Sequence, residues 1–313
     1  MEKKCLYCYL PLGEYETDFH PKCSRKMFGT ATVPDLPYSE KELEPLALSV
    51  IENQTALTGV QPKLSLHLST GKANPKRFTI VGLWGGYILK PSSTNYPQLP
   101  EVEDLTMHLA AIAKIKTVPH SLIRMNSGNL AYITKRIDRA KKGKIHMEDM
   151  CQLTERLTED KYRGSYEQIA KAIKKLSKTP GLDLVNFYEL VLFCFLTGNA
   201  DMHLKNFSLI NHPSIGPTLS PGYDLLNTAL VNPADEEQMA LTLNGKKNRI
   251  KKKDFTAAFQ AAGLDEKQQE NIFKKMLIAK DPWLKMVDIS FLSEEFKGSY
   301  KAILNERFEE LGI

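Results

Sequence analysis

The residues of this chain that could do chemistry gather in residues 198–207, GNADMHLKNF, and in the triplet GYD at 222–224. Asp201 lies five positions before Asn206, and Asp224 adds a second carboxylate downstream. Phosphoryl transfer needs a carboxylate that receives the proton of the acceptor hydroxyl, and oxygen ligands for Mg²⁺. Asp201 fits the catalytic base, and Asn206 and Asp224 fit the Mg²⁺ ligands. The alternative is a polar loop whose Asp and Asn side chains cap their own backbone.

The flanking sequence predicts the elements that position this loop. Residues 185–197, VNFYELVLFCFLT, are apolar with helical spacing and predict a buried helix. Gly198 ends that helix, and the alternating pattern that starts at Phe207 predicts a short strand. Protein kinases have the same Asp-x4-Asn spacing in their catalytic loop, with a later Asp. The pattern therefore indicates a kinase, in which His203 is expected to hold the loop in shape.

Lys90 ends a predicted strand, YILK. A lysine on a strand can direct its cation at nucleotide phosphates, and a glutamate on the next helix can fix its position. Glu101 and Glu103 both lie in the first turn of the next helical pattern, and Glu103 lies on its apolar face. Glu103 is therefore the expected partner. A surface lysine at a strand end is the alternative.

Residues 55–65, TALTGVQPKLS, form a predicted turn that could face the phosphates. Gly59 permits a tight backbone, and Thr58 and Lys63 carry groups that bind phosphate. The pattern is neither G-x-G-x-x-G nor a Walker A loop, so a simple connecting hairpin is the alternative.

Two cysteines, Cys5 and Cys8, and the pair His20 and Cys23 have the spacing of zinc ligands. Four such ligands would leave no position open, so a bound zinc would be structural. It would also give folding free energy to a short segment with little core. The alternative is unligated thiols, with His20 in a turn.

Two further motifs allow both a functional and a structural interpretation. The cluster around His146, Glu148 and Cys151 lies at a predicted strand-to-helix boundary, where acidic residues usually cap the helix. Residues 245–253, GKKNRIKKK, hold six cations and no anion. Such a run is either a solvated face or a contact to a phosphate backbone.

Composition narrows the class of protein. The chain has 313 residues, 42% hydrophobic and 25% charged, with a net charge of +5. These values describe an ordinary globular protein, and the mild charge does not by itself imply nucleic acid. There is no apolar run of roughly 18 residues and no signal-peptide pattern, so we expect a cytoplasmic protein without a membrane partner. The odd number of five cysteines argues against a disulfide framework.

The periodicity along the chain predicts an α+β fold with two lobes. A short Cys-containing segment is expected at 1–40, a smaller β-rich kinase N-lobe at 41–147 and a larger helical C-lobe at 148–313. Helical patterns in the C-lobe cover 148–157, 165–177, 183–197, 253–262, 265–279 and 292–310.

With these motifs in view, the chain resembles the HipA family of bacterial toxin kinases. The similar blocks are TGVQPKLSL at 58–66, YILKP at 87–91, HMEDMCQ at 146–152, GNADMHLKNFSL at 198–209, GYDLL at 222–226 and LNGKKNR at 243–249. The opening DFHPKCSRKMFG at 18–29 also resembles that of many short members. The short segment before the kinase core makes the chain most similar to the HipT type, in which the N-terminal subdomain is a separate small protein.

This resemblance implies a two-lobed Ser/Thr protein kinase that uses Mg-ATP. It implies Lys90 on the nucleotide phosphates, Asp201 as the catalytic base, and Asn206 and Asp224 as Mg²⁺ ligands. Targets of relatives are aminoacyl-tRNA synthetases, modified on a serine, which halts translation and growth. The expected partners are a HipB-like helix-turn-helix antitoxin and a small HipS-like protein, with DNA contacted only through the antitoxin complex.

The sequence departs from the family in the loop where relatives autophosphorylate serines. It has Thr55, Ala56 and Thr58 there, so Thr58 is the remaining candidate acceptor. Two rival functions stay open. One is a kinase of the same fold that acts on a small molecule or lipid, and the other is a catalytically silent DNA-binding corepressor.

Overall fold

The computed structural model describes residues 3–43, 45, 63–69, 76–81, 84–140 and 143–313. Contacts within the chain divide it into two compact units. The sheet unit comprises Met1–Asp104, Val118–Ile137 and Ile289–Phe291, and the helical unit comprises Leu105–Thr117, Asp138–Asp288 and Leu292–Ile313. The division falls inside helix α3 (Leu99–Ile112). The lobe boundaries expected at residues 40 and 147 stay predictions.

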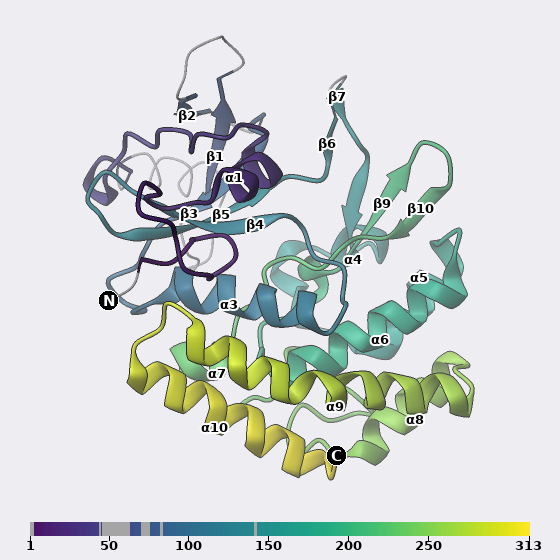
Figure 1. Ribbon diagram of the computed structural model, residues 1–313. Coiled ribbons are helices and arrows are strands. Elements are labelled where there is room, and N and C mark those ends of the chain that lie inside the picture. Colours follow the sequence, from purple (N-terminus) through teal and green to yellow (C-terminus); the bar gives the residue numbers. More distant parts are fainter. Residues whose placement is uncertain (1–2, 44, 46–62, 70–75, 82–83, 141–142) are drawn as a thin grey trace. The chain divides into compact units, whose positions relative to one another are not determined.

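The sheet unit contains a five-stranded antiparallel sheet with the strand order β2-β1-β3-β5-β4 (Figure 1). Its strands are β1 (Leu64–Leu68), β2 (Phe78–Ile80), β3 (Tyr87–Lys90), β4 (His120–Arg124) and β5 (Leu130–Lys135). The alternation read from the sequence appears in β1, where Leu64 and Leu66 are buried and His67 is exposed. Lys90 therefore lies at the end of the central strand, opposite Tyr132 of β5.

The N-terminal segment packs on this sheet through helix α1 (Pro21–Phe28). The ring of Phe28 makes edge contacts with Phe78 of β2, and Tyr87 of β3 donates its hydroxyl to the carbonyl of Met27 at 3.3 Å. Gly29 ends the helix in the left-handed region with φ of 75°, where glycine has no steric cost.

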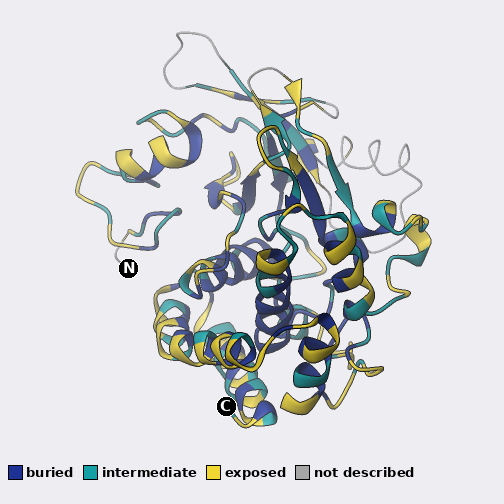
Figure 2. Cartoon of the chain, turned by 90° about the vertical axis from the view of Figure 1, so that its right-hand side faces the viewer, coloured by how far each residue is buried: buried dark blue, intermediate teal, exposed yellow. Residues whose placement is uncertain are grey.

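The helical unit is built around helix α6 (Pro180–Leu196), which is buried without interruption from Phe187 to Leu196 (Figure 2). The helices around it are α4 (Met150–Leu153), α5 (Tyr166–Leu176), α7 (Thr228–Val231), α8 (Lys252–Ala262), α9 (Glu266–Ile289) and α10 (Glu294–Leu311), with the 3-10 turns η1 (Thr158–Asp160) and η2 (Leu204–Asn206). The short strands are β6 (Arg139–Ala140), β7 (Gly143–Lys144), β8 (Met147–Asp149), β9 (Ser208–His212) and β10 (Gly216–Leu219). The sequence pattern therefore predicted the central helix correctly.

Two helices differ from the sequence prediction. The pattern at 148–157 yields only the four residues of α4, because the residues before it form β8 and pair with β9. Helix α9 continues past Pro282, where the pattern suggested an end near residue 279. The indole of Trp283 is fully buried and donates to the carbonyl of Leu109 at 2.8 Å, which holds the continuation in place.

No helix in the described ranges combines the length and the apolar character that a membrane crossing requires.

The turn before β3 gives a direct test of this packing. A Cβ on Gly85 would lie 2.5 Å from the carbonyl oxygen of Leu66, whereas a Cβ on Gly86 would meet nothing within 4 Å. We expect Gly85→Ala to lower the free energy of unfolding by about 2 kcal/mol, because the neighbouring strand must shift. Gly86→Ala is the matched control and should change it by less than about 1 kcal/mol. Equal denaturant midpoints for the two variants would contradict the described turn.

Candidate functional site

The segment after α6 is held in shape by a glycine and by a hydrogen-bonded loop. Gly198 has φ of 67°, and a Cβ there would lie 2.8 Å from Oδ1 of Asn227. The hydroxyl of Thr228 donates to the carbonyl of Gly198 at 3.2 Å and accepts from the backbone N–H of Ala200 at 2.8 Å. The chain therefore leaves the buried helix along one fixed path.

Within this loop, Asp201 and Asn206 are linked directly. The side-chain amide of Asn206 donates to the backbone carbonyl of Asp201 at 2.8 Å, and the N–H of His203 donates to the same carbonyl at 2.9 Å. Asn206 is buried, with 8% of its surface exposed, whereas the side chain of Asp201 is 51% exposed. The loop therefore fixes the backbone of Asp201 and presents its carboxylate to solvent.

Tyr162 is a neighbour of Asp201 that the sequence reasoning missed. Its hydroxyl donates to Oδ1 of Asp201 at 2.5 Å, and its ring makes an edge contact with His203 at 4.9 Å between centroids. Burial raises the pKa of the Tyr162 phenol, and the charge of Asp201 raises it further. Tyr162 therefore stays a hydrogen-bond donor to Asp201 at neutral pH. Nothing in the local sequence marks it, because its partner lies 39 residues away.

The imidazole of His203, within this loop, is buried. Burial lowers its pKa to about 4, although the negative charge of Asp201 acts to raise it. Its Nδ1 has no hydrogen-bond partner among the described residues. The ring is therefore neutral at pH 7, and it packs against the ring of Tyr162. The negative charge of Asp224 raises the pKa of His203, as that of Asp201 does.

Asp224 itself has an unusual backbone. Its φ of 54° lies in the left-handed region, which a non-glycine residue rarely adopts without support from its surroundings. That support comes from the two residues before it. Gly222 donates its N–H to the carbonyl of Lys116 at 2.8 Å, and the hydroxyl of Tyr223 donates to the carbonyl of Lys205 at 3.0 Å. The helical unit thus brings Asp201, Asn206 and Asp224 into one region.

The sheet unit holds the second predicted element, an ion pair between Lys90 and Glu103. Their Nζ and Oε1 atoms are 2.5 Å apart, and the two residues are 4% and 1% exposed. The ring of Tyr132 also lies 5.3 Å from the Lys90 ammonium. Glu103 is therefore the glutamate that pairs with the lysine, and Glu101 is not its partner in the described contacts.

The predicted phosphate-facing turn lies mostly outside the described residues. Thr55, Ala56, Thr58 and Gly59 are among those that the structure does not describe. Lys63 is described and is exposed just before β1.

The cluster around His146 is a helix cap, as interpreted from the sequence. Asp149 accepts from the N–H of Gln152 at 3.0 Å, and the Gln152 side chain accepts from the N–H of Asp149 at 3.1 Å. His146 pairs with Glu148 at 2.9 Å on the surface. A capping box therefore accounts for Asp149 and Gln152 of this cluster.

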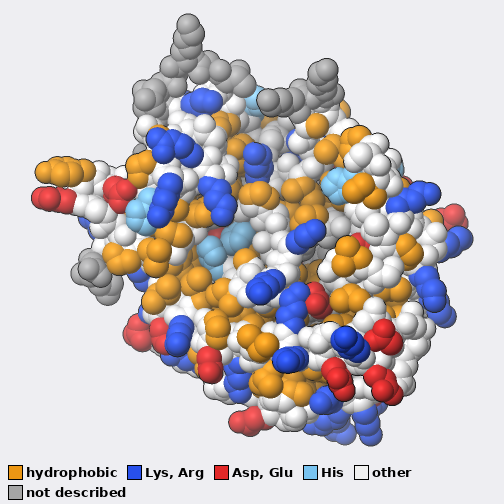
Figure 3. Space-filling view, turned by 45° about the vertical axis from the view of Figure 1, so that its right-hand side comes forward, with side chains coloured by type: hydrophobic (Ala, Val, Ile, Leu, Met, Phe, Trp, Pro, Cys, Tyr) orange, Lys and Arg blue, Asp and Glu red, His pale blue; other side chains and the backbone are white. Residues whose placement is uncertain are grey.

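The basic run at 245–253 is partly neutralised by its surroundings. Lys246 pairs with Asp254 at 2.8 Å, and Lys247 pairs with Glu237 at 2.9 Å. Ile250 within the run is fully buried. On the face drawn in Figure 3, Lys and Arg side chains are scattered among hydrophobic and acidic ones. These contacts favour a folded, solvated segment over an open phosphate-binding patch.

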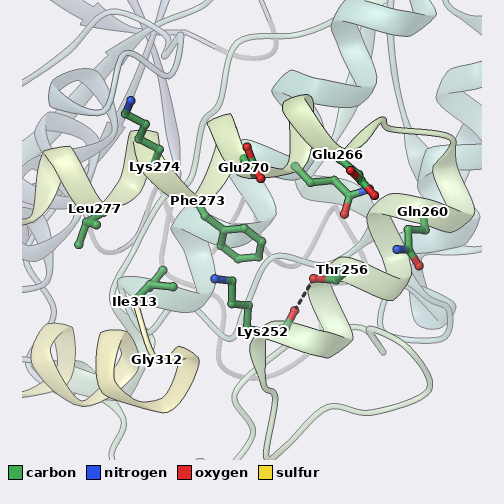
Figure 4. Close-up of a pocket in the computed structure, with 11 residues that line it drawn as sticks. Lys252, Thr256, Gln260, Glu266, Glu270, Phe273, Lys274, Leu277, Gly312 and Ile313 are labelled. Atoms are coloured by element: carbon green, nitrogen blue, oxygen red, sulfur yellow. Dashed lines mark hydrogen bonds between the residues drawn. The ribbon is translucent and has the colours of Figure 1, made fainter.

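A pocket of about 560 Å³ lies among α8, α9 and the C-terminal residues (Figure 4). Lys252, Phe273 and Ile313 line it, and the hydroxyl of Thr256 donates to the carbonyl of Lys252 at 3.2 Å within it. None of the residues predicted for phosphoryl transfer lines this pocket, so it is separate from the candidate site.

The predicted zinc ligands in the sheet unit also come together. The ligand atoms of Cys5, Cys8, His20 and Cys23 all lie within 4.8 Å of one another.

Known proteins are similar to this chain in sequence and in fold. The family of the HipA-like C-terminal domain matches residues 55–283. A putative kinase Y4dM of Sinorhizobium fredii is 32% identical over 64% of this chain and 50% of its own length. A putative kinase of Haemophilus influenzae is 31% identical over 63% of this chain and 59% of its own length. The chain thus spans about half the length of the curated relatives it matches.

Two solved structures share the fold. HipA of Shewanella oneidensis, in complex with HipB and operator DNA, matches with a TM-score of 0.71 at 22% identity, over 90% of this chain and 73% of that one. The proinflammatory kinase CtkA of Helicobacter pylori matches with a TM-score of 0.54 at 16% identity, over 79% of this chain and 93% of that one. The expected α+β, kinase-like fold is therefore confirmed.

The buried ion pair generates a stability prediction. Lys90→Met leaves the Glu103 carboxylate buried without this cation and should lower the free energy of unfolding by about 3 kcal/mol or more. The double variant Lys90→Met with Glu103→Gln should recover most of that loss. Lys297→Met removes a pair whose Glu294 is 90% exposed, and as a control it should cost less than about 1 kcal/mol. Chemical denaturation of the four proteins measures this, and a mild effect of Lys90→Met would contradict the buried pair.

Proposed function

The chain belongs to the HipA-like C-terminal domain family, and from that premise we propose that it is an ATP-dependent Ser/Thr protein kinase of the HipT type. It acts as the toxin of a HipBST-like toxin–antitoxin system. The kinase phosphorylates a serine of a protein involved in translation, with an aminoacyl-tRNA synthetase as the proposed target. Growth arrest follows from the block of translation.

The observation that carries the proposal is the presentation of Asp201. Its backbone carbonyl is fixed by two donors, while its carboxylate is half exposed. The described side-chain contacts of this carboxylate use Oδ1, with Tyr162 as the donor at 2.5 Å. Oδ2 is then left for the hydroxyl of a serine or threonine, whose proton Asp201 would accept as the phosphoryl group is transferred.

Asn206 and Asp224 fit the requirements of Mg²⁺. The Asn206 amide nitrogen is engaged with the carbonyl of Asp201, so its oxygen is the atom directed elsewhere. Together with the Asp224 carboxylate, this gives the oxygen ligands that Mg²⁺ prefers. The left-handed backbone of Asp224, held by its two preceding residues, gives its side chain a fixed direction, as a metal ligand requires. Bound Mg²⁺ would neutralise charge on the nucleotide phosphates.

Lys90 is the proposed ligand of those phosphates. Burial next to Glu103 keeps the ammonium in one place, as the Lys–Glu pair of protein kinases does. Gly59, Thr58 and Lys63 are proposed to complete the phosphate contacts, with Thr58 as the candidate site of autophosphorylation.

The partners are proposed from the relatives. The Shewanella HipA structure contains HipB and operator DNA. We propose that this chain likewise binds a helix-turn-helix antitoxin and meets DNA only in that complex. Lys246 and Lys247 are paired with acidic side chains, which lowers the positive charge that the basic run could offer to a DNA backbone without the antitoxin.

Incubation with γ-labelled ATP and Mg²⁺, with and without a bacterial lysate, tests the kinase assignment. The wild type should label a protein band, and mass spectrometry of the band identifies the target. Asp201→Asn should lower the labelling at least about a hundredfold while the circular dichroism spectrum stays unchanged, because the catalytic base is lost.

Glu159→Gln is the matched control, since Glu159 is an exposed carboxylate of the same unit with no proposed role. It should label as the wild type does. Full labelling by Asp201→Asn would contradict the assigned base. ATP turnover with label only on small molecules or lipids would contradict the protein-kinase proposal and favour the rival acceptor.

A further inference from the structure

Phosphoryl transfer does not account for the cluster of three sulfurs and one imidazole near the N-terminus. Cys5 and Cys23 are buried, and Cys8 and His20 are partly buried. All four side chains offer ligand atoms within 4.8 Å of one another. Thiolate and imidazole are the ligands that zinc prefers, so the cluster has the composition of a Cys3His site.

A tight turn brings the first two cysteines together. The N–H of Tyr9 donates to the carbonyl of Cys5 at 2.9 Å, and the N–H of Cys5 donates to the carbonyl of Leu10 at 2.9 Å. Tyr9 has φ of 64°, so a side chain of this size is held in the left-handed region. In this turn the side chains of Cys5 and Cys8 face the same cluster of ligand atoms.

Helix α1 supplies the second pair. His20 is its N-cap residue, and the N–H of Cys23 donates to the carbonyl of His20 at 2.9 Å. Residues three apart in a helical turn lie on the same side of the helix. His20 and Cys23 therefore project together toward the turn that carries Cys5 and Cys8.

The distances between ligand atoms suit a tetrahedral ion. Zinc bonds of about 2.3 Å to sulfur and 2.0 Å to nitrogen give a sulfur–nitrogen edge of about 3.5 Å in a tetrahedron. Nδ1 of His20 lies 3.4 Å from the sulfur of Cys8 and 3.7 Å from that of Cys23. These two edges therefore match those of a tetrahedral zinc site to within a few tenths of an ångström.

The orientation of His20 is also fixed for metal binding. Its Nε2 lies 2.9 Å from the carbonyl oxygen of Pro11, which can only accept a hydrogen bond. Nε2 must therefore carry the proton, and the lone pair of Nδ1 points at the sulfurs. A metal-binding histidine usually donates its other ring N–H to a carbonyl or carboxylate oxygen in the same way.

We propose that Cys5, Cys8, His20 and Cys23 bind one structural Zn²⁺, and that this zinc turn fixes the beginning of α3 through Tyr9. Residues 10–18, between the two pairs of ligands, contain no buried side chain, and Leu10 and Tyr15 there are 52% and 93% exposed. Metal binding is a usual source of folding free energy for such a short piece of chain.

The contact from the zinc turn to α3 is a buried hydrogen bond. The hydroxyl of Tyr9 donates to Oδ2 of Asp104 at 2.8 Å, and Nδ1 of His120 lies 2.6 Å from Oδ1 of the same carboxylate. Asp104 is fully buried and follows Glu103 directly. The turn also meets β4, because the N–H of Leu122 donates to the carbonyl of Leu6 at 3.3 Å. Loss of the metal would therefore loosen the part of α3 that carries Glu103.

Metal content tests the first part of the proposal. The full chain, purified under reducing conditions without a metal-affinity column, should contain one zinc ion per chain by mass spectrometry of the metal. Replacement by Co²⁺ should give the thiolate charge-transfer and visible bands of a tetrahedral Cys3His site. Cys8→Ser should lose the metal, and Cys151→Ser, a buried cysteine outside the cluster, should keep it.

If Cys8→Ser fails to fold, the cobalt spectrum of the wild type still tests whether the site binds metal. A wild type without zinc and without cobalt bands after refolding with the metal would overturn it. A disulfide within the cluster under reducing conditions would overturn it as well.

Hydrogen exchange tests the second part. Removal of zinc by a chelator should speed exchange of the α3 amides before Leu105 at least about tenfold, and Tyr9→Phe should do the same with zinc still bound. Tyr15→Phe is the control and should leave exchange unchanged. Unchanged exchange after zinc loss would contradict the link to α3. The effect of the zinc on Glu103 matters for catalysis only if the proposed function is correct. Metal content and hydrogen exchange do not depend on that function, so the zinc proposal and the kinase proposal can fail separately.

Discussion

The carbonyl oxygen of Asp201 accepts two hydrogen bonds, and the geometry of the candidate site depends on this point. The donors are the N–H of His203 and the side-chain amide of Asn206, so the proposed base and one proposed metal ligand are fixed by the same atom. The path into this loop is set by Gly198, where a side chain would collide with Asn227. The backbone of this loop therefore sets the positions of the catalytic side chains.

The sheet unit contains charged side chains that are buried. Two consecutive acidic residues of α3, Glu103 and Asp104, are both almost completely buried. Lys90 compensates the first, and His120 and the hydroxyl of Tyr9 bind the second. Buried charges are tolerated only when such partners are in place. The N-terminal segment, with its proposed zinc, is thereby tied to the residues that hold Lys90.

The sequence predicted the features that depend on local pattern. The apolar run before Gly198 is helix α6, the motif at 146–152 is a helix cap, and the apolar face of α3 pointed to Glu103 rather than Glu101. It could not predict features set by distant partners. β8 replaces the start of the expected helix because it pairs with β9, some 60 residues later. Tyr162 was missed for the same reason, because its partner Asp201 lies 39 residues later.

The most direct test of the account is the binding of Mn²⁺, in place of Mg²⁺, in the presence of a non-hydrolysable ATP analogue. Electron paramagnetic resonance measures the free ion for the wild type, for Asp224→Asn and for Glu159→Gln. The account predicts nucleotide-dependent binding that Asp224→Asn weakens at least about tenfold, because one carboxylate ligand is lost, while Glu159→Gln binds as the wild type does. Equal Mn²⁺ affinity of the wild type and Asp224→Asn would contradict the assignment of this loop as the metal–nucleotide site.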